Sequence, residues 1–90
     1  MRVRRARRQP IGPTYITFGR TIRELRVRRG LSQEQLGLHG GLHRNYVASI
    51  ERGEINPTLR TMLRLQRGLD FPLSEIVLLF DQRRDEGDRP

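Results

Sequence analysis

The chain has 90 residues, enough for one small domain, and carries 18 arginines, no lysine and 10 acidic residues. The resulting net charge of +8 and sequence pI of about 11.6 favour polyanionic partners, nucleic acid first and an anionic membrane surface second. Without cysteine the chain can form neither a disulfide nor a thiolate metal site, and no apolar run approaches the roughly 18 to 20 residues of a membrane span.

Residues 1–16 are predicted to form a flexible, Arg-rich arm. Met1–Pro13 holds five arginines, two prolines and no acidic residue, and like charges at this density keep a segment extended. No apolar signal core follows the arginines, so we expect an intracellular, cytoplasmic protein. In one interpretation the arm lies along DNA phosphates or enters a minor groove. In the other it has no function. Its candidate DNA-contacting residues are Arg2, Arg4, Arg5, Arg7 and Arg8.

The first predicted helix starts at about Thr17, where a domain spanning residues 17–80 begins. Apolar residues recur at helical spacing from this point, and Gly30 can end the helix in a left-handed conformation. Every later segment with a clear pattern is helical as well. The predicted fold class is therefore all-α, a compact arrangement of five short helices without strands.

Two short amphipathic segments joined by adjacent glycines make up residues 32–52. Ser32 is a good N-cap for the first segment, and Gln35 stands where a capping box requires it. The glycines break this helix, and Gly41 can adopt the positive φ that such a turn needs. His43 can cap the second segment. That segment presents a polar face on a strongly basic chain, and a nucleic-acid duplex is its most natural partner.

Two further helices follow the loop after residue 52. Thr58 can cap a helix that ends near Leu69, because a capping hydroxyl satisfies an unpaired N–H group at the helix start. Pro72 can start a fifth helix that ends at about Phe80. Residues 81–90 are polar and mixed in charge, and we expect them to form a frayed tail.

The predicted core is marginal for roughly 65 ordered residues. On the fifth helix, Leu78 and Leu79 fall outside the stripe that is expected to complete this core, formed by Leu73, Ile76, Val77 and Phe80. An exposed apolar pair of this kind favours a dimer interface, although a rotated helix would bury it inside the monomer. The predicted core residues are Ile22, Leu25, Leu31, Leu36, Leu42, Val47, Ile50, Leu63, Leu69, Leu73 and Ile76.

The chain resembles the Cro/phage-repressor helix-turn-helix proteins, also called the XRE family, over Phe18 to Ile76. Leu31-Ser32-Gln33, Ile50-Glu51-Arg52-Gly53 and Asn56-Pro57-Thr58-Leu59 carry the resemblance. In size and layout it is most similar to the five-helix controller proteins of restriction-modification systems. The resemblance implies a lambda-repressor-like domain that regulates transcription, binding a near-palindromic operator in double-stranded DNA as a homodimer.

Three positions in the second predicted helix bear on this resemblance. Gly37 corresponds to a small residue where the second and third helices cross, so a side chain larger than Ala is expected to push them apart. Gly40 replaces a small apolar residue and is expected to loosen the end of the second helix. Leu38 lies on a face that is usually polar in the family. These departures concern helix stability more than function.

The resemblance implies a recognition helix from about Arg44 to Arg52 in the major groove. Arg44 suits the guanine edge and Asn45 suits adenine, by donor and acceptor geometry. His43 either caps the helix or touches a phosphate, and Tyr46 either packs or contacts a phosphate through its hydroxyl group. The complete set of expected DNA contacts is Gln33, His43, Arg44, Asn45, Ser49, Arg52, Asn56 and Thr58. The family also implies a structural ion pair, Arg26 with Glu51, between the first and third helices.

Other classes of function fit the sequence less well. No Ser/His/Asp or phosphate-loop arrangement is present, so we expect no enzyme and no cofactor. His39 and His43 lie on either side of the hinge glycines without an evident third ligand, so we expect no metal site. The alternative function is a protein-interaction module with the same fold, either an antitoxin with a toxin partner or a coactivator-like scaffold. An Arg-rich RNA or membrane binder would explain the arm but not the hinge.

Overall fold

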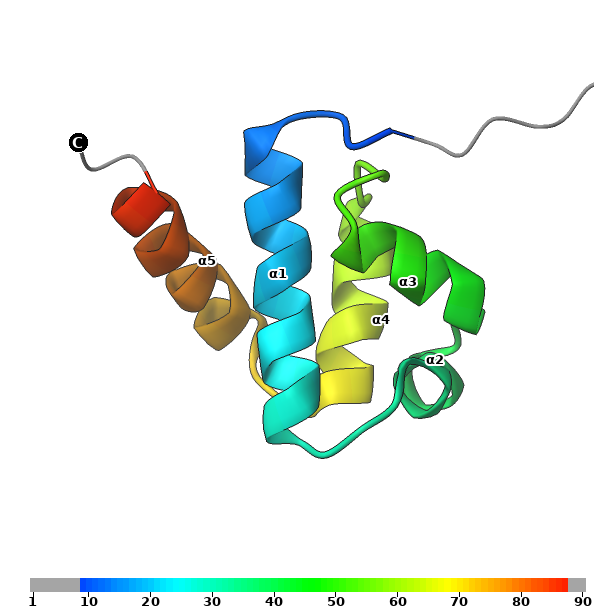
Figure 1. Ribbon diagram of the computed structural model, residues 1–90. Helices are drawn as coiled ribbons and strands as arrows, with labels where there is room; N and C mark the ends of the chain where they lie inside the picture. Colours follow the sequence, from blue (N-terminus) through cyan, green and yellow to red (C-terminus); the bar gives the residue numbers. More distant parts are fainter. Residues whose placement is uncertain (1–8, 88–90) are drawn as a thin grey trace, which may run out of the picture.

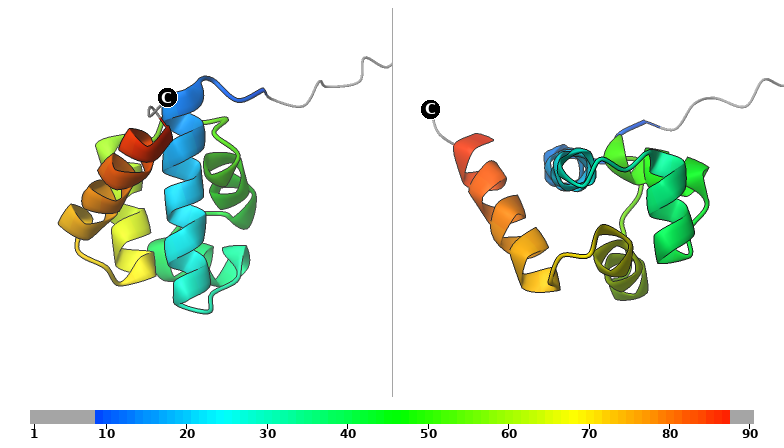
Figure 2. Two further views of the ribbon diagram at one scale, coloured as in Figure 1. Left: turned by 60° about the vertical axis from the view of Figure 1, so that its left-hand side comes forward. Right: turned by 90° about the horizontal axis from the view of Figure 1, so that it is seen from below.

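The computed structural model describes residues 9–87, which contain five helices and no strand. The helices are α1 (Pro13–Arg28), α2 (Gln33–Gly40), α3 (Arg44–Glu51), α4 (Leu59–Leu69) and α5 (Leu73–Gly87) (Figure 1). Seen from below, α1 stands end-on between α5 on one side and the pair α2 and α3 on the other (Figure 2). The all-α, five-helix prediction is confirmed.

Two helices are longer than the sequence indicates. α1 starts at Pro13 rather than at about Thr17, so residues 13–16 belong to the helix and not to the arm. Proline is compatible with this place because the first N–H of a helix has no partner inside the helix. α5 continues to Gly87, so the predicted frayed tail is wrong for residues 81–87. Its last turns contain two ion pairs at three-residue spacing, Asp81 with Arg84 and Arg83 with Glu86.

The hinge between α2 and α3 follows the predicted pattern closely. Ser32 accepts a hydrogen bond from the backbone N–H of Gln35, whose side chain in turn accepts from the N–H of Ser32, which completes the capping box. Gly41 ends α2 with a φ of 75°. Gly40 is buried, and a Cβ atom there would lie 2.5 Å from the carbonyl oxygen of Arg64. The second glycine therefore allows α2 to approach α4 and does not merely loosen the helix end.

The crossing of α2 and α3 is tighter than the sequence suggests. A Cβ atom on Gly37 would lie 2.3 Å from the carbonyl oxygen of Leu42, so even a methyl group would press on the backbone of the turn. The N–H of Leu42 donates to the carbonyl oxygen of Gly37 at 2.8 Å, which holds the two segments together. Leu38 points away from this contact and is 75% exposed.

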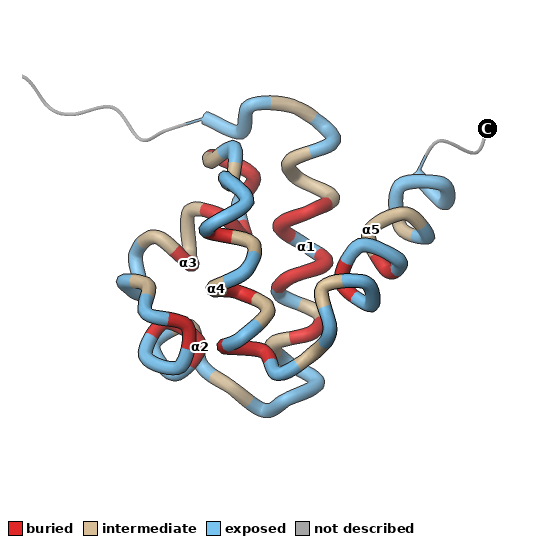
Figure 3. Tube along the Cα trace, turned by 180° about the vertical axis from the view of Figure 1, so that it is seen from behind, coloured by how far each residue is buried: buried red, intermediate tan, exposed pale blue. Residues whose placement is uncertain are grey.

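Most of the predicted core is buried between the helices (Figure 3). One prediction is wrong: Leu63 is 45% exposed, and Leu65 takes its place on the inner face of α4. The predicted residues Leu31, Leu42 and Leu73 are only partly buried. The buried apolar residues are Phe18, Ile22, Leu25, Leu36, Val47, Ile50, Leu65, Leu69, Ile76 and Leu79.

The rotation of α5 differs from the predicted one. Ile76 and Leu79 face the core, whereas Val77 is 37% exposed and Leu78 58% exposed. The prediction that Leu79 lies in an exposed interface is therefore wrong, because this residue is only 8% exposed and belongs to the monomer core. Leu78 remains available for contact with another molecule.

Two side-chain contacts dock α5 against α1. The rings of Phe18 and Phe80 meet edge to face with centroids 5.7 Å apart. Farther along, Arg83 donates two hydrogen bonds to the carboxylate of Glu24, at 3.0 and 2.9 Å, and Arg28 donates a third at 2.6 Å. Hydrogen bonding from Arg83 lowers the pKa of Glu24 below its ordinary value of 4.5, against the opposing effect of partial burial.

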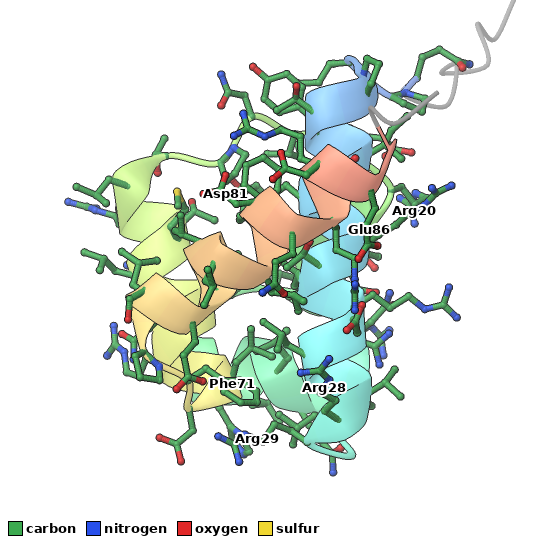
Figure 4. The ribbon with its side chains drawn as sticks, turned by 90° about the vertical axis from the view of Figure 1, so that its left-hand side faces the viewer. Arg20, Arg28, Arg29, Phe71, Asp81 and Glu86 are labelled. Carbon is green, nitrogen blue, oxygen red and sulfur yellow. The ribbon has the colours of Figure 1, made fainter. Side chains whose placement is uncertain are left out.

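Arg29, at the end of α1, holds the connector between α4 and α5. Its guanidinium group lies 3.9 Å from the ring centroid of Phe71 (Figure 4). The same group donates to the carbonyl oxygens of Leu69, at 2.9 Å, and Asp70. Asp70 ends α4 in the left-handed conformation, and Arg29 satisfies carbonyl groups that the helix leaves without a partner. The contact fixes the point from which α5 departs.

Candidate nucleic-acid interface

The third helix presents a polar face to solvent and an apolar face to the core. Val47 and Ile50 are fully buried, while Arg44 and Asn45 are exposed and Ser49 is half-buried. The interpretation of α3 as a recognition helix requires Asn45 and Ser49 to be accessible, and the structure meets this requirement. Neither side chain is used to hold the fold together in the interior.

His43 caps the start of α3. Its Nδ1 atom accepts a hydrogen bond of 3.0 Å from the backbone N–H of Asn45. Because a neutral imidazole accepts through one nitrogen and donates through the other, this geometry assigns the proton to Nε2. The capping interpretation is confirmed. The exposed Nε2–H group remains a candidate donor to a phosphate.

Arg44 has one weak contact across the hinge. Its Nη1 atom lies 3.6 Å from a carboxylate oxygen of Glu34, and both side chains are more than 60% exposed. Ion pairs exposed to this extent contribute little to stability because water and salt screen them. The guanidinium group of Arg44 can therefore leave Glu34 for a base edge at small cost.

The carboxylate of Glu51 joins three helices at the end of α3. Arg26 donates to it twice, from Nε at 2.6 Å and from Nη2 at 3.0 Å, which is the predicted ion pair. Burial is deep, since the side chains of Arg26 and Glu51 are 13% and 4% exposed. The amide of Gln33 also donates to Glu51, at 3.1 Å. The second N–H of that amide takes no part in this hydrogen bond.

Tyr46 of α3 and two residues after this helix take part in local structure. The hydroxyl group of Tyr46 lies 3.4 Å from Oγ1 of Thr61 and its ring packs against the core, so the packing interpretation is the one the structure shows. Thr58 caps α4 by accepting from the N–H of Thr61 at 3.2 Å. Asn56 and Thr58 are both exposed. A phosphate contact by either residue stays a prediction.

Sequence reasoning missed the partner of Arg52. Glu54 is buried, and its carboxylate accepts hydrogen bonds from Nε and Nη2 of Arg52 at 2.8 and 3.2 Å. The two residues are separated only by Gly53, whose φ of 76° turns the chain back on itself. The sequence signal for this ion pair was an acidic residue directly after an Arg-Gly turn in a basic chain.

The root of the arm is attached beside this turn. The N–H of Ile11 donates to the carbonyl oxygen of Gly53 at 2.9 Å. An open cavity of about 540 Å³ lies here, between the arm root, α1 and the end of α3. It is lined by Gln9, Pro10, Ile16, Arg20, Glu51, Arg52 and Glu54. The predicted arm contacts, Arg2, Arg4, Arg5, Arg7 and Arg8, lie outside the described residues.

A second surface feature adjoins α5. An apolar groove of about 250 Å³ lies between α1, α5 and the start of α4. Its lining residues are Thr14, Tyr15, Phe18, Asn56, Pro57, Met62, Val77 and Phe80. Within residues 9–87 no helix is both long and apolar enough to cross a bilayer, and no group of three His, Cys, Asp or Glu residues could hold a metal ion.

Comparison with known proteins places residues 22–76 in the sequence pattern of the helix-turn-helix family. Control protein C.SmaI of Serratia marcescens is 36% identical over 66 residues, covering 73% of this chain and 79% of that protein. The restriction-modification controller protein C.AhdI of Aeromonas hydrophila shares 44% identity with a TM-score of 0.67, covering 69% of this chain and 94% of its own.

A further controller protein, C.Esp1396I, has a crystal structure that superimposes with a TM-score of 0.79 over 83% of this chain and 97% of its own. The sequence identity is 21%, so this likeness concerns the fold alone. It covers more of the chain than the match to C.AhdI does, and it supports the five-helix architecture.

Proposed function

The chain belongs to the helix-turn-helix family, and from this premise we propose that it regulates transcription by binding a specific double-stranded DNA site as a homodimer. The observation that carries the proposal is the division of α3 into two faces. Val47 and Ile50 anchor the helix in the core, while Arg44, Asn45 and Ser49 are left accessible on the other side. A helix held in this way can enter the major groove without rearrangement of the fold.

The proposed base contacts come from the first turn of α3. Arg44 reads a guanine through two parallel N–H donors, and Asn45 reads an adenine through its amide. Each such pair is worth about 1 to 3 kcal/mol of discrimination against a wrong base. Ser49 lies one to two turns farther along the same helix and completes the row of polar side chains.

Phosphate contacts on both sides of α3 set the register on the duplex. At the start of α3 we assign this role to the Nε2–H group of His43. At the end of α3 we assign it to Gln33, through its remaining amide N–H, and to Arg52, Asn56 and Thr58.

The homodimer is proposed to form through the outer surface of α5. Leu78 is 58% exposed, and two other residues of α5, Val77 and Phe80, help to line the apolar groove. A two-fold axis at this surface repeats α3 on the other protomer, and recognition helices about 34 Å apart select a near-palindromic site. Sedimentation over a range of concentrations tests this part, and a strict monomer at high concentration would exclude it.

The Arg-rich arm is proposed to add phosphate or minor-groove contacts beside the recognition helix. Its root is hydrogen-bonded from Ile11 to Gly53, one residue after Arg52. The arm therefore leaves the domain at the C-terminal end of the recognition region. The proposed partner, chromosomal DNA, places the protein at the nucleoid in the cytoplasm.

Selection from random double-stranded oligonucleotides tests the function directly. We expect an enriched sequence with two inverted half-sites. The variants Arg44→Ala and Asn45→Ala should each bind this site about 5- to 150-fold more weakly and lose preference at one position per half-site. Arg67→Ala, which removes an exposed arginine of α4, is the matched control and should keep the preference. A selection without any enriched sequence would overturn the proposal.

A further inference from the structure

The turn after α3 places a buried carboxylate behind an exposed arginine. Gly53 adopts a φ of 76°, and its N–H donates to the carbonyl oxygen of Ile50 at 3.0 Å. The N–H of Glu54 donates to the carbonyl oxygen of Ser49, also at 3.0 Å. These two backbone bonds fold the chain back against the last turn of the helix, so Glu54 comes under the side chain of Arg52.

The carboxylate holds the guanidinium group through two parallel hydrogen bonds. Nε of Arg52 donates to one oxygen at 2.8 Å, and Nη2 donates to the other at 3.2 Å. The side chain of Glu54 is only 5% exposed, whereas that of Arg52 is 41% exposed. The hydrogen bonds that Arg52 donates to Glu54 are also the main reason why the pKa of Arg52 is raised above its ordinary value. The carboxylate is thus fixed in the interior, and the arginine is fixed at the surface.

Arg52 is exposed at the end of α3 and keeps N–H donors that Glu54 does not use. A guanidinium group has five N–H donors in one plane. Nη2 lies 3.4 Å from the hydroxyl group of Ser49, so the arginine is also aligned with the polar face of α3. Within residues 9–87 the hydrogen bonds of this side chain come from Nε and Nη2, and a planar fork with donors remaining on Nη1 suits a phosphate oxygen.

We propose that Glu54 is a positioning residue that holds Arg52 in the orientation needed to bind a DNA phosphate next to Ser49. The inference rests on the proposed DNA-binding function. A free arginine side chain samples many rotamers and loses this freedom when it binds. Because Glu54 orders the side chain before DNA arrives, that loss occurs during folding and not during binding. In this proposal the carboxylate does not contact the DNA and affects binding through its contact with Arg52.

The carboxylate of Glu54 also has an effect that opposes DNA binding. The direction in which the affinity changes when this charge is removed therefore decides which effect dominates. A carboxylate near the interface repels phosphates, and it occupies donors that could otherwise bind DNA. If this effect dominated, removal of the charge from Glu54 would strengthen binding. If positioning dominates, the same change weakens binding even though the protein becomes more positive.

The experiment measures affinity for the selected operator with Glu54→Gln, Arg52→Ala and the double variant. Asp85→Asn is the control for charge, because it removes one acid from an exposed position near the end of α5. Relative to this control, Glu54→Gln should weaken binding about 2- to 10-fold, the effect of one disordered long side chain. In the Arg52→Ala background, Glu54→Gln should have no further weakening effect. Arg52→Ala should also reduce the slope of log affinity against log salt by about 0.9, as expected for one phosphate contact.

Three results would overturn the inference. Glu54→Gln could bind more tightly than Asp85→Asn, which would make the carboxylate a competitor of DNA. It could bind equally well, which would leave Glu54 without a role in binding. It could weaken binding as much in the Arg52→Ala background as in the native chain, which would show an effect through the fold. In each case the native protein still binds its operator, so these results leave the proposed DNA-binding function intact. That function is tested by the oligonucleotide selection.

Melting curves keep a structural role apart from a positioning role. Glu54 is buried, and its replacement can lower the melting temperature. Affinity is therefore measured well below the transition of the least stable variant. Glu54→Asp retains the charge with a shorter side chain and provides a second test: partial recovery of affinity relative to Glu54→Gln is expected, and no recovery would count against the contact with Arg52.

Discussion

A Cβ atom on Gly19 would lie 2.3 Å from the carbonyl oxygen of Ile50. Gly19 is in the middle of α1, and Ile50 is in the last turn of α3. The backbones of the two helices therefore touch directly, with no side chain between them at this point. The position and tilt of α3 depend on the absence of a methyl group on α1.

The variant Gly19→Ala tests this contact. The added methyl group must displace the end of α3, and overpacking of this kind costs about 1 to 3 kcal/mol of unfolding free energy. Operator affinity should fall as well, because Ser49 and Arg52 move with the helix end. Thermal unfolding and binding are measured on the same samples. Gly87→Ala, where a Cβ meets nothing within 4 Å, is the control. An unchanged melting temperature for Gly19→Ala would contradict the structure here.

Glu51→Ala should destabilise the fold more than it perturbs any single DNA contact. The change leaves Arg26 without its carboxylate in a largely buried place, and breaking a buried pair costs about 3 to 5 kcal/mol. Chemical denaturation gives the loss of unfolding free energy. Glu34→Ala removes the exposed partner of Arg44 and should cost less than about 1 kcal/mol. Equal stability of Glu51→Ala and the native chain would disprove the role of the ion pair.

Leu78 and Leu79 should respond to mutation in opposite ways. Leu78→Asp is expected to weaken self-association while the monomer keeps its melting temperature, since the side chain is 58% exposed. Leu79→Ala should cost about 2 to 5 kcal/mol of unfolding free energy, because the side chain is buried in the core. Sedimentation and thermal unfolding measure the two effects. If Leu78→Asp left the association constant unchanged, the proposed interface on α5 would be wrong.

The attachment of α5 should weaken in acid. The folded state lowers the pKa of Glu24 below 4.5, chiefly through the hydrogen bonds from Arg83. A lowered pKa means that the contact contributes its full stability above pH 4.5 and loses it as the pH falls through the lower, folded-state value. Unfolding free energies between pH 7 and pH 3 should therefore fall less for Glu24→Gln than for the native chain. Parallel curves would show that Glu24 does not contribute to this pH dependence.

Deletion of residues 1–10 should lower operator affinity and reduce its dependence on salt. Each phosphate that the arm no longer neutralises reduces the slope of log affinity against log salt by about 0.9, because fewer counterions are released on binding. A variant with all five arm arginines replaced by glutamine keeps the length of the chain and should behave in the same way. If both variants kept the native slope, the arm would not contact the phosphates.

Local chemistry explains which parts of the fold could be predicted. The capping box of Ser32 and Gln35, the left-handed Gly41 and the cap at Thr58 each depend on residues close together in the sequence. The ion pair of Arg26 and Glu51 joins distant residues, and it was available only through resemblance to a family. The predicted helix ends failed where a tertiary contact extends a helix, as Arg83 and Glu24 do for α5.

The division of α5 into buried and exposed residues could not be settled from its pattern. Val77, Leu78 and Leu79 are adjacent apolar residues, and a helix can rotate to bury any one of them. Packing of Phe80 against Phe18, together with the contact of Arg83 with Glu24, selects the rotation that buries Leu79. Both partners lie on α1, more than fifty residues earlier in the chain.

By itself the sequence determined a basic, all-α domain in which two short helices meet at a glycine turn and the second has a polar face, since caps, turns and amphipathic spacing act over a few residues. Only the tertiary structure decided which side-chain N–H donors are already used within the fold. The side-chain amide of Gln33 donates a hydrogen bond to Glu51, and the guanidinium group of Arg52 donates to Glu54. These pairs form where the chain folds back on itself. A hydrogen bond requires a particular distance and angle between donor and acceptor, and the spacing of residues along the chain does not specify either.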